Sequence, residues 1–105
     1  MEKNYRGWTG LIENLRSDLH KIAPGLHITE ISESALGGLQ VYYSSKGLTA
    51  QQGAAVDARV KRAEDAAWQT CRVCGSLGAP AYLLGVPHAR VLCEKHKPAD
   101  WNFIN

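Results

Sequence analysis

Four residues in the last third of the chain have the types and the spacing of a metal site. Two residues stand between Cys71 and Cys74, and two stand between Cys93 and His96, which gives the pattern C-x2-C-x18-C-x2-H. Each short turn lets two side chains converge on one ion, at Zn–S distances of about 2.3 Å and Zn–N distances of about 2.0 Å. Four protein ligands complete a tetrahedron and leave no position for water. The pattern therefore predicts one structural Zn²⁺ ion per chain and no hydrolytic centre.

The neighbouring residues help to weigh the alternatives. Gly75 follows Cys74 directly, and glycine permits a positive-φ turn that directs backbone N–H groups at thiolate sulfur. Buried thiols or a redox pair are less favoured, because a redox C-x-x-C opens a helix after a strand, whereas Cys71 follows a predicted helix. Covalent haem attachment requires histidine where Gly75 stands. His96 has the expected spacing for the fourth ligand, and His88 is the alternative candidate for that position.

The residues before this motif predict two helices with a β-hairpin between them. Apolar residues at helical spacing predict an amphipathic helix over 11–22, capped by Thr9 and ended by Pro24-Gly25. Alternating β-formers over 26–33 and 39–44 flank a glycine pair and predict an antiparallel hairpin. A second helix is predicted from its N-cap Thr49 to about residue 69. Its core-facing stripe consists of Val56, Val60, Ala63, Ala67 and Trp68.

The polar residues of this first part are expected to face solvent. Glu64 and Asp65 are adjacent on the second helix, so they point apart and do not form a carboxylate pair. His20 and His27 lie far from the cysteines along the chain, and we expect them on the surface.

Residues 70–105 are expected to form a zinc-ribbon-like module, in which a short hairpin over 81–84 and 90–92 lies between two ligand turns. The whole chain is then a small α+β protein, a single domain over 1–105 with a helix–hairpin–helix part over 1–69. Loss of a cysteine ligand is expected to unfold the last third. The apolar tail of Trp101, Phe103 and Ile104 belongs either to the core or to an interface. If the tail folds back, Trp101 is expected against the first helix, near Leu15 and Leu19.

Composition limits the class of protein. The 105 residues are 45% apolar and 21% charged, which is typical of a folded domain, and three cysteines cannot form a closed set of disulfides. The net charge of +2 does not by itself indicate a nucleic-acid or membrane partner. Residues 1–5 lack the apolar segment of a signal peptide, and no run approaches the roughly 18 apolar residues of a membrane span. We therefore expect a soluble cytoplasmic protein.

From about residue 26 to 97, the chain resembles a family of small uncharacterised proteins from bacteria and their phages. Members typically carry a strand, a turn reading K-E-K-F-G-G-L-R, an aromatic strand, an acidic helix, C-x-x-C-G and a final L-C-x-x-H. The matching segments here are Gly37-Gly38-Leu39-Gln40-Val41-Tyr42-Tyr43, Cys71-Arg72-Val73-Cys74-Gly75-Ser76-Leu77-Gly78 and Leu92-Cys93-Glu94-Lys95-His96. The departures are Ser34, Ala35 and Leu36 before the glycines, and Gln40 in place of arginine. The resemblance implies the fold, the metal and frequent phage origin, but no activity.

Three classes of function remain to be compared. An enzyme is not expected, because the chain has no nucleophile motif, no phosphate-binding loop and no evident small-molecule substrate site. A zinc-ribbon protein that binds nucleic acid or regulates transcription is the alternative, because cations gather near the metal motif and Tyr42 and Tyr43 offer stacking surfaces. Those cations are Arg72, Arg90, Lys95 and Lys97, with Arg59, Lys61 and Arg62 on the second helix.

The preferred interpretation is a non-catalytic module that binds another protein. Three tryptophans and an aromatic tail suit this role, because aromatic side chains are efficient interface anchors. Together with the phage resemblance, this predicts an inhibitor or modulator of a host protein complex, such as a defence system, acting in the host cytoplasm.

Overall fold

A computed structural model describes residues 5–104. Residues 1–4, on which most of the expected absence of a signal peptide rests, lie outside the described part of the chain. Residues 5–104 form two helices, a short 3-10 turn and two small antiparallel sheets, which confirms the predicted α+β class. The elements are a 3-10 turn at Arg6–Trp8, α1 at Thr9–Ile22, β1 at His27–Glu33, β2 at Leu39–Ser44, α2 at Ala50–Ala67, β3 at Ala79–Tyr82, β4 at Ala89–Leu92 and β5 at Asn102–Phe103. No helix among these residues has the length and apolarity needed to cross a bilayer.

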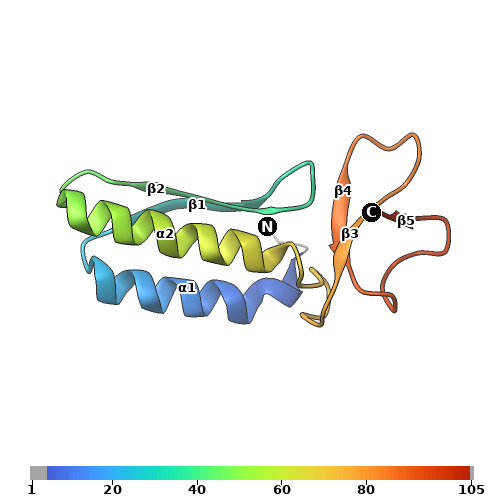
Figure 1. The fold of residues 1–105 in the computed structure, drawn as a ribbon, viewed down its shortest axis with the longest axis horizontal. Helices are drawn as coiled ribbons and strands as arrows, with labels where there is room; N and C mark the ends of the chain where they lie inside the picture. The colour runs from blue at the N-terminus through green and yellow to red at the C-terminus, as the bar shows by residue number, and fades with distance from the viewer. Residues whose placement is uncertain (1–4, 105) are drawn as a thin grey trace.

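The two helices lie side by side, and the β1–β2 hairpin runs along them as a second layer (Figure 1). Thr49 caps α2 as predicted. Its hydroxyl accepts from the Gln52 amide at 3.0 Å, while the Gln52 side chain accepts from the Thr49 amide at 3.1 Å. The predicted cap of α1 is wrong: Thr9 is the first helical residue, and Trp8 stands at the N-cap. The chain enters α1 through the 3-10 turn, so no side-chain cap is present there.

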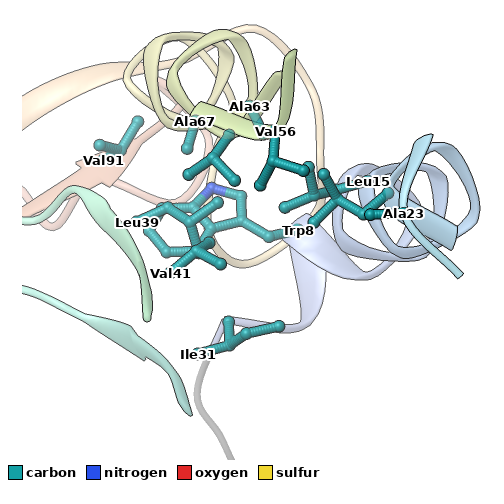
Figure 2. Close-up of a cluster of buried hydrophobic side chains, with 12 residues drawn as sticks. Trp8, Leu15, Ala23, Ile31, Leu39, Val41, Val56, Ala63, Ala67 and Val91 are labelled. Carbon is teal, nitrogen blue, oxygen red and sulfur yellow. The ribbon is translucent and has the colours of Figure 1, made fainter. Parts of the chain in front are cut away.

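Trp8 lies at the centre of the main hydrophobic core, fully buried between the helices and β2 (Figure 2). The predicted stripe of α2 packs around it, with Trp68 half-buried at its end. Its other neighbours are Leu15, Leu19 and Ala23 from α1, Ile31 from β1, Leu39 and Val41 from β2, and Val91 from β4. The indole N–H of Trp8 donates to the Thr70 carbonyl at 2.8 Å, so the one polar atom of this ring is satisfied.

Glu64 is not the solvated residue that the sequence predicted. Its carboxylate accepts a hydrogen bond from the Val41 amide at 3.2 Å, so it holds the edge of β2 against α2. Asp65 is exposed, as expected, and lies 4.0 Å from the Lys61 ammonium. His20 and His27 are exposed as well.

The second sheet has the order β4-β3-β5 and stands at the end of the helical layer (Figure 1). The predicted hairpin accounts for β3 and β4, but the third strand was not predicted. Asn102 and Phe103 form it by pairing with Tyr82 and Ala81. The tail therefore folds back, but onto β3 and not onto α1. Trp101 and Phe103 are half-buried in a small second core with Cys71, Ala81, Leu92 and Cys93.

One carboxylate joins the hairpin to the second sheet. Glu33, at the end of β1, accepts from Arg72 Nη2 at 2.8 Å, and its Oε1 lies 3.3 Å from Arg90 Nε. The three side chains are only 10%, 16% and 25% exposed. Beside them the Ala89 amide donates to the Ala35 carbonyl at 2.8 Å, which closes the outer edge of β4. Two cations proposed for nucleic-acid contact are thus engaged within the fold.

Glu33→Gln is expected to lower the free energy of unfolding by about 2–3 kcal/mol, because two guanidinium groups then lose their shared counter-charge in a largely buried place. Chemical denaturation with circular dichroism measures the change. Asp65→Asn is the matched control. It breaks an ion pair whose side chains are 77% and 64% exposed, so its effect should stay below about 0.5 kcal/mol. Equal effects of the two substitutions would contradict the bridging role of Glu33.

Candidate metal centre

Two tight turns carry the cysteines and the histidine. Cys71 lies just beyond α2, and its amide donates to the Ser76 carbonyl at 2.8 Å while its carbonyl accepts from Gly75 at 2.9 Å. Gly75 has φ +83°, the positive value predicted for this position. The second turn follows β4, where the Cys93 carbonyl accepts from the amides of His96 and Lys97 at 3.1 and 2.9 Å. The β3–β4 hairpin brings these turns together, because Ala79 pairs with Leu92.

The four predicted residues come together at one point. Their potential ligand atoms all lie within 4.8 Å of one another. Cys74 Sγ lies 3.7 Å from Cys93 Sγ, and His96 Nδ1 lies 3.2 Å from Cys93 Sγ and 3.9 Å from Cys71 Sγ. A zinc tetrahedron with sulfur at about 2.3 Å has edges of about 3.7 Å, so these separations fit a metal of that size. The cluster could therefore hold a metal ion, with the imidazole binding through Nδ1.

The electrostatics of the cluster favour deprotonated sulfur. A hydrogen bond from the Ser76 hydroxyl is the main cause that lowers the pKa of Cys93 to about 6, and the His96 side chain adds to the effect. Ser76 also lowers the pKa of Cys74, whose sulfur lies 2.9 Å from the hydroxyl oxygen. The pKa of His96 is raised, first by its hydrogen bond with Cys93. Since metals bind the thiolate form, the lowered pKa values of Cys74 and Cys93 favour coordination by these two sulfurs.

Ser76 is a site residue that the sequence analysis did not single out. Its position two residues beyond Cys74 is the only sequence signal for it, and serine at such a place is ordinary for a turn. The structure gives it a role because the turn at Gly75 brings the hydroxyl back toward the sulfur atoms.

His88 does not join the cluster. It lies in the connection between β3 and β4, and its ring centre is 6.4 Å from that of Trp101. Of the two candidates for the fourth ligand, only His96 lies near the cysteines.

The first ligand turn rests directly on the N-terminal part of the chain. The Gly7 amide donates to the Arg72 carbonyl at 2.7 Å, and Trp8 bonds to Thr70 as described above. A Cβ atom on Gly7 would lie 2.1 Å from the Cys71 carbonyl oxygen and 2.5 Å from the Gly75 amide nitrogen. Only glycine permits this approach, so Gly7 is a second residue of the site that the sequence analysis missed.

Comparison of the chain with protein-family models, with curated proteins and with solved structures finds no match.

Proposed function

We propose that this chain is a non-catalytic protein-binding module, held in shape by one structural Zn²⁺ ion at Cys71, Cys74, Cys93 and His96 in a zinc-ribbon-like arrangement. The donor set supports zinc, because three thiolates and one imidazole in a tetrahedron are typical of structural zinc sites. With four protein ligands, such a site keeps no position for a substrate or an activated water molecule.

The observation that carries the binding role is the exposure of three leucines on the turns of the fold. Leu84 in the β3–β4 connection is 86% exposed, Leu77 beyond the first ligand turn is 80% exposed, and Leu36 between β1 and β2 is 72% exposed. Large apolar side chains on turns add little to folding, and each of these three offers an exposed apolar contact to another protein. The family resemblance adds the more specific proposal of a phage-encoded modulator of a host complex.

Nucleic-acid binding is the second candidate, but the described contacts favour it less. Arg72 and Arg90 pair with Glu33, Arg59 pairs with Asp18 at 2.7 Å, and Lys97 donates to the Trp101 carbonyl at 2.8 Å. Exposed cations that remain from the proposed set are Lys61, Arg62 and Lys95. These offer few phosphate contacts, and phosphate contacts supply most of non-specific affinity.

A capture experiment distinguishes the two candidate functions. The zinc-loaded full chain is fixed to a support and exposed to a bacterial lysate at physiological salt. We expect a protein to be retained, and to remain after nuclease treatment, because apolar contacts do not depend on counterion release. Charge reversal at Arg62 and Lys95, two residues that hold no described ion pair, should leave this capture unchanged. Retention of DNA or RNA that these reversals and added salt abolish would establish the nucleic-acid function instead.

A further inference from the structure

A groove runs along the outer edge of β1, between this strand and α1. Two cavities of ≈ 370 and ≈ 410 Å³ lie there, and Arg16 and Ile28 line both of them, so the cavities adjoin. The second cavity is lined by every residue over 28–31. Because successive side chains of a strand point to opposite faces, a cavity over one face would touch alternate residues. Contact with consecutive residues places this groove along the backbone edge.

The edge presents backbone groups to the groove. The Ile31 carbonyl accepts from the Tyr5 hydroxyl at 3.1 Å, and Tyr5 lines the same cavity, so the N–H and C=O groups of Ile31 face this side. Thr29 has no partner on β2, since the register passes from Ile28↔Tyr43 to Glu30↔Tyr42 across a bulge. Within residues 5–104 the sheet consists of β1 and β2 alone. The bulged edge therefore has hydrogen-bonding capacity that β2 does not use.

The walls of the groove carry charges of both signs and only a little exposed apolar surface. Leu19 and Ala23 line the first cavity but are almost fully buried, so its apolar surface comes from Leu26 and Ile28. The exposed imidazoles of His20 and His27 lie beside them. Arg16 is exposed, and among the described residues no carboxylate lies within ion-pair distance of it. Glu30 is the acidic residue of the groove, and it lines the cavity at the Tyr5 end.

We infer that this groove binds an extended peptide segment of a partner protein, which adds to β1 as a third strand and places a carboxylate against Arg16. The inference rests on the proposed protein-binding function and adds a second contact surface, separate from the exposed leucines. Strand addition supplies affinity through main-chain hydrogen bonds to the backbone of Thr29 and to the N–H of Ile31, whose carbonyl is already bonded to Tyr5. Alternate side chains of the segment then contact Leu26 and Ile28, and its acidic residue faces Arg16, which favours acidic over basic segments.

The test uses the zinc-loaded full chain and two capped peptides, acetyl-Thr-Val-Glu-Val-Thr-Val-Thr-amide and the same peptide with lysine for glutamate. Nuclear magnetic resonance titration should show saturable shifts of the Thr29 and Ile31 amides and of the Arg16 guanidinium with the glutamate peptide. Arg16→Glu should lower the affinity for the glutamate peptide about tenfold and raise the affinity for the lysine peptide, because the favourable charge pair is then formed with lysine. Arg62→Glu, an exposed reversal on α2, should change neither affinity.

A second probe isolates the strand pairing without altering the protein. The glutamate peptide, N-methylated at alternate amides, keeps its side chains but loses the donors that face β1, so it should not bind. The inference is wrong if both charged peptides bind alike, if N-methylation has no effect, or if the shifts map away from the groove. It is also wrong if edge amides of β1 shift with protein concentration alone, because a second copy would then occupy the edge.

These outcomes are distinguishable from those of the capture experiment. If a lysate protein is captured equally by Arg16→Glu and by the unchanged chain, the groove is not the docking site, although protein binding stands. If the peptide results hold but no lysate protein is captured, the groove binds peptides and the proposed function fails.

Discussion

Removal of the proposed zinc ion is expected to unfold the whole chain in one transition, and not only the residues after 70. The candidate metal centre is in direct contact with the main core. The first ligand turn packs on Gly7, Thr70 accepts from the Trp8 indole, and Val91 of β4 lies in the same core as Trp8. Apparent zinc binding energies of about 10–16 kcal/mol match or exceed the roughly 5–15 kcal/mol of a domain's total stability. The expectation that only the last third would unfold is therefore revised.

Chelation, or Cys93→Ser, tests this expectation. Circular dichroism of the helices and fluorescence of the buried Trp8 should change together, and amide exchange should speed up in α1 as well as in β4. Metal analysis of the folded protein should give one zinc per chain. His96→Ala should weaken metal retention, whereas the matched variant His88→Ala should not, since His88 lies outside the cluster. Helices that stay protected after complete chelation would refute the coupling.

Gly7→Ala is expected to destabilise the protein by about 3 kcal/mol or more, an unusually large effect for the addition of one methyl group. The new Cβ would lie 2.1 Å from the Cys71 carbonyl oxygen and 2.9 Å from the Arg72 carbonyl carbon. Both are backbone atoms, so relief requires the first ligand turn to move away from the N-terminal segment. That movement would also stretch the hydrogen bond from the Gly7 amide to Arg72.

Gly10→Ala provides the matched control. This glycine lies in α1, and a Cβ there would meet nothing within 4 Å. Alanine favours the helix over glycine by about 0.5–1 kcal/mol, so the control should stabilise the protein slightly. Thermal and chemical denaturation should therefore show a lower free energy of unfolding for Gly7→Ala and a slightly higher one for Gly10→Ala. Equal behaviour of both variants would show that Gly7 does not contact the ligand turn closely.

Local patterns predicted most of the elements. The apolar spacing of α2 and its cap at Thr49 are properties of neighbouring residues, so they are visible in sequence and recur in the structure. The four metal-site residues were found for the same reason, because each pair lies within one turn.

The features that were missed depend on contacts between distant residues. Asn102 and Phe103 form a strand only because β3 offers an edge, and two residues carry no periodic signal. Glu33 looks like any solvent-facing strand residue until Arg72 and Arg90 reach it from the second sheet. Gly7 likewise has no local motif, since its requirement for glycine comes from a turn more than sixty residues away. Such pairings are set by tertiary geometry, which periodicity does not encode.

The contact of Gly7 with the first ligand turn also affects the order in which the protein can fold during synthesis. The segment around Trp8 leaves the ribosome first, yet the groups that receive it, Thr70 and the turn over 71–75, emerge much later. The proposed metal ion could not be fully coordinated until His96 has followed. During translation, a long intermediate therefore exists in which the residues that surround Trp8 in the finished core are not yet all present.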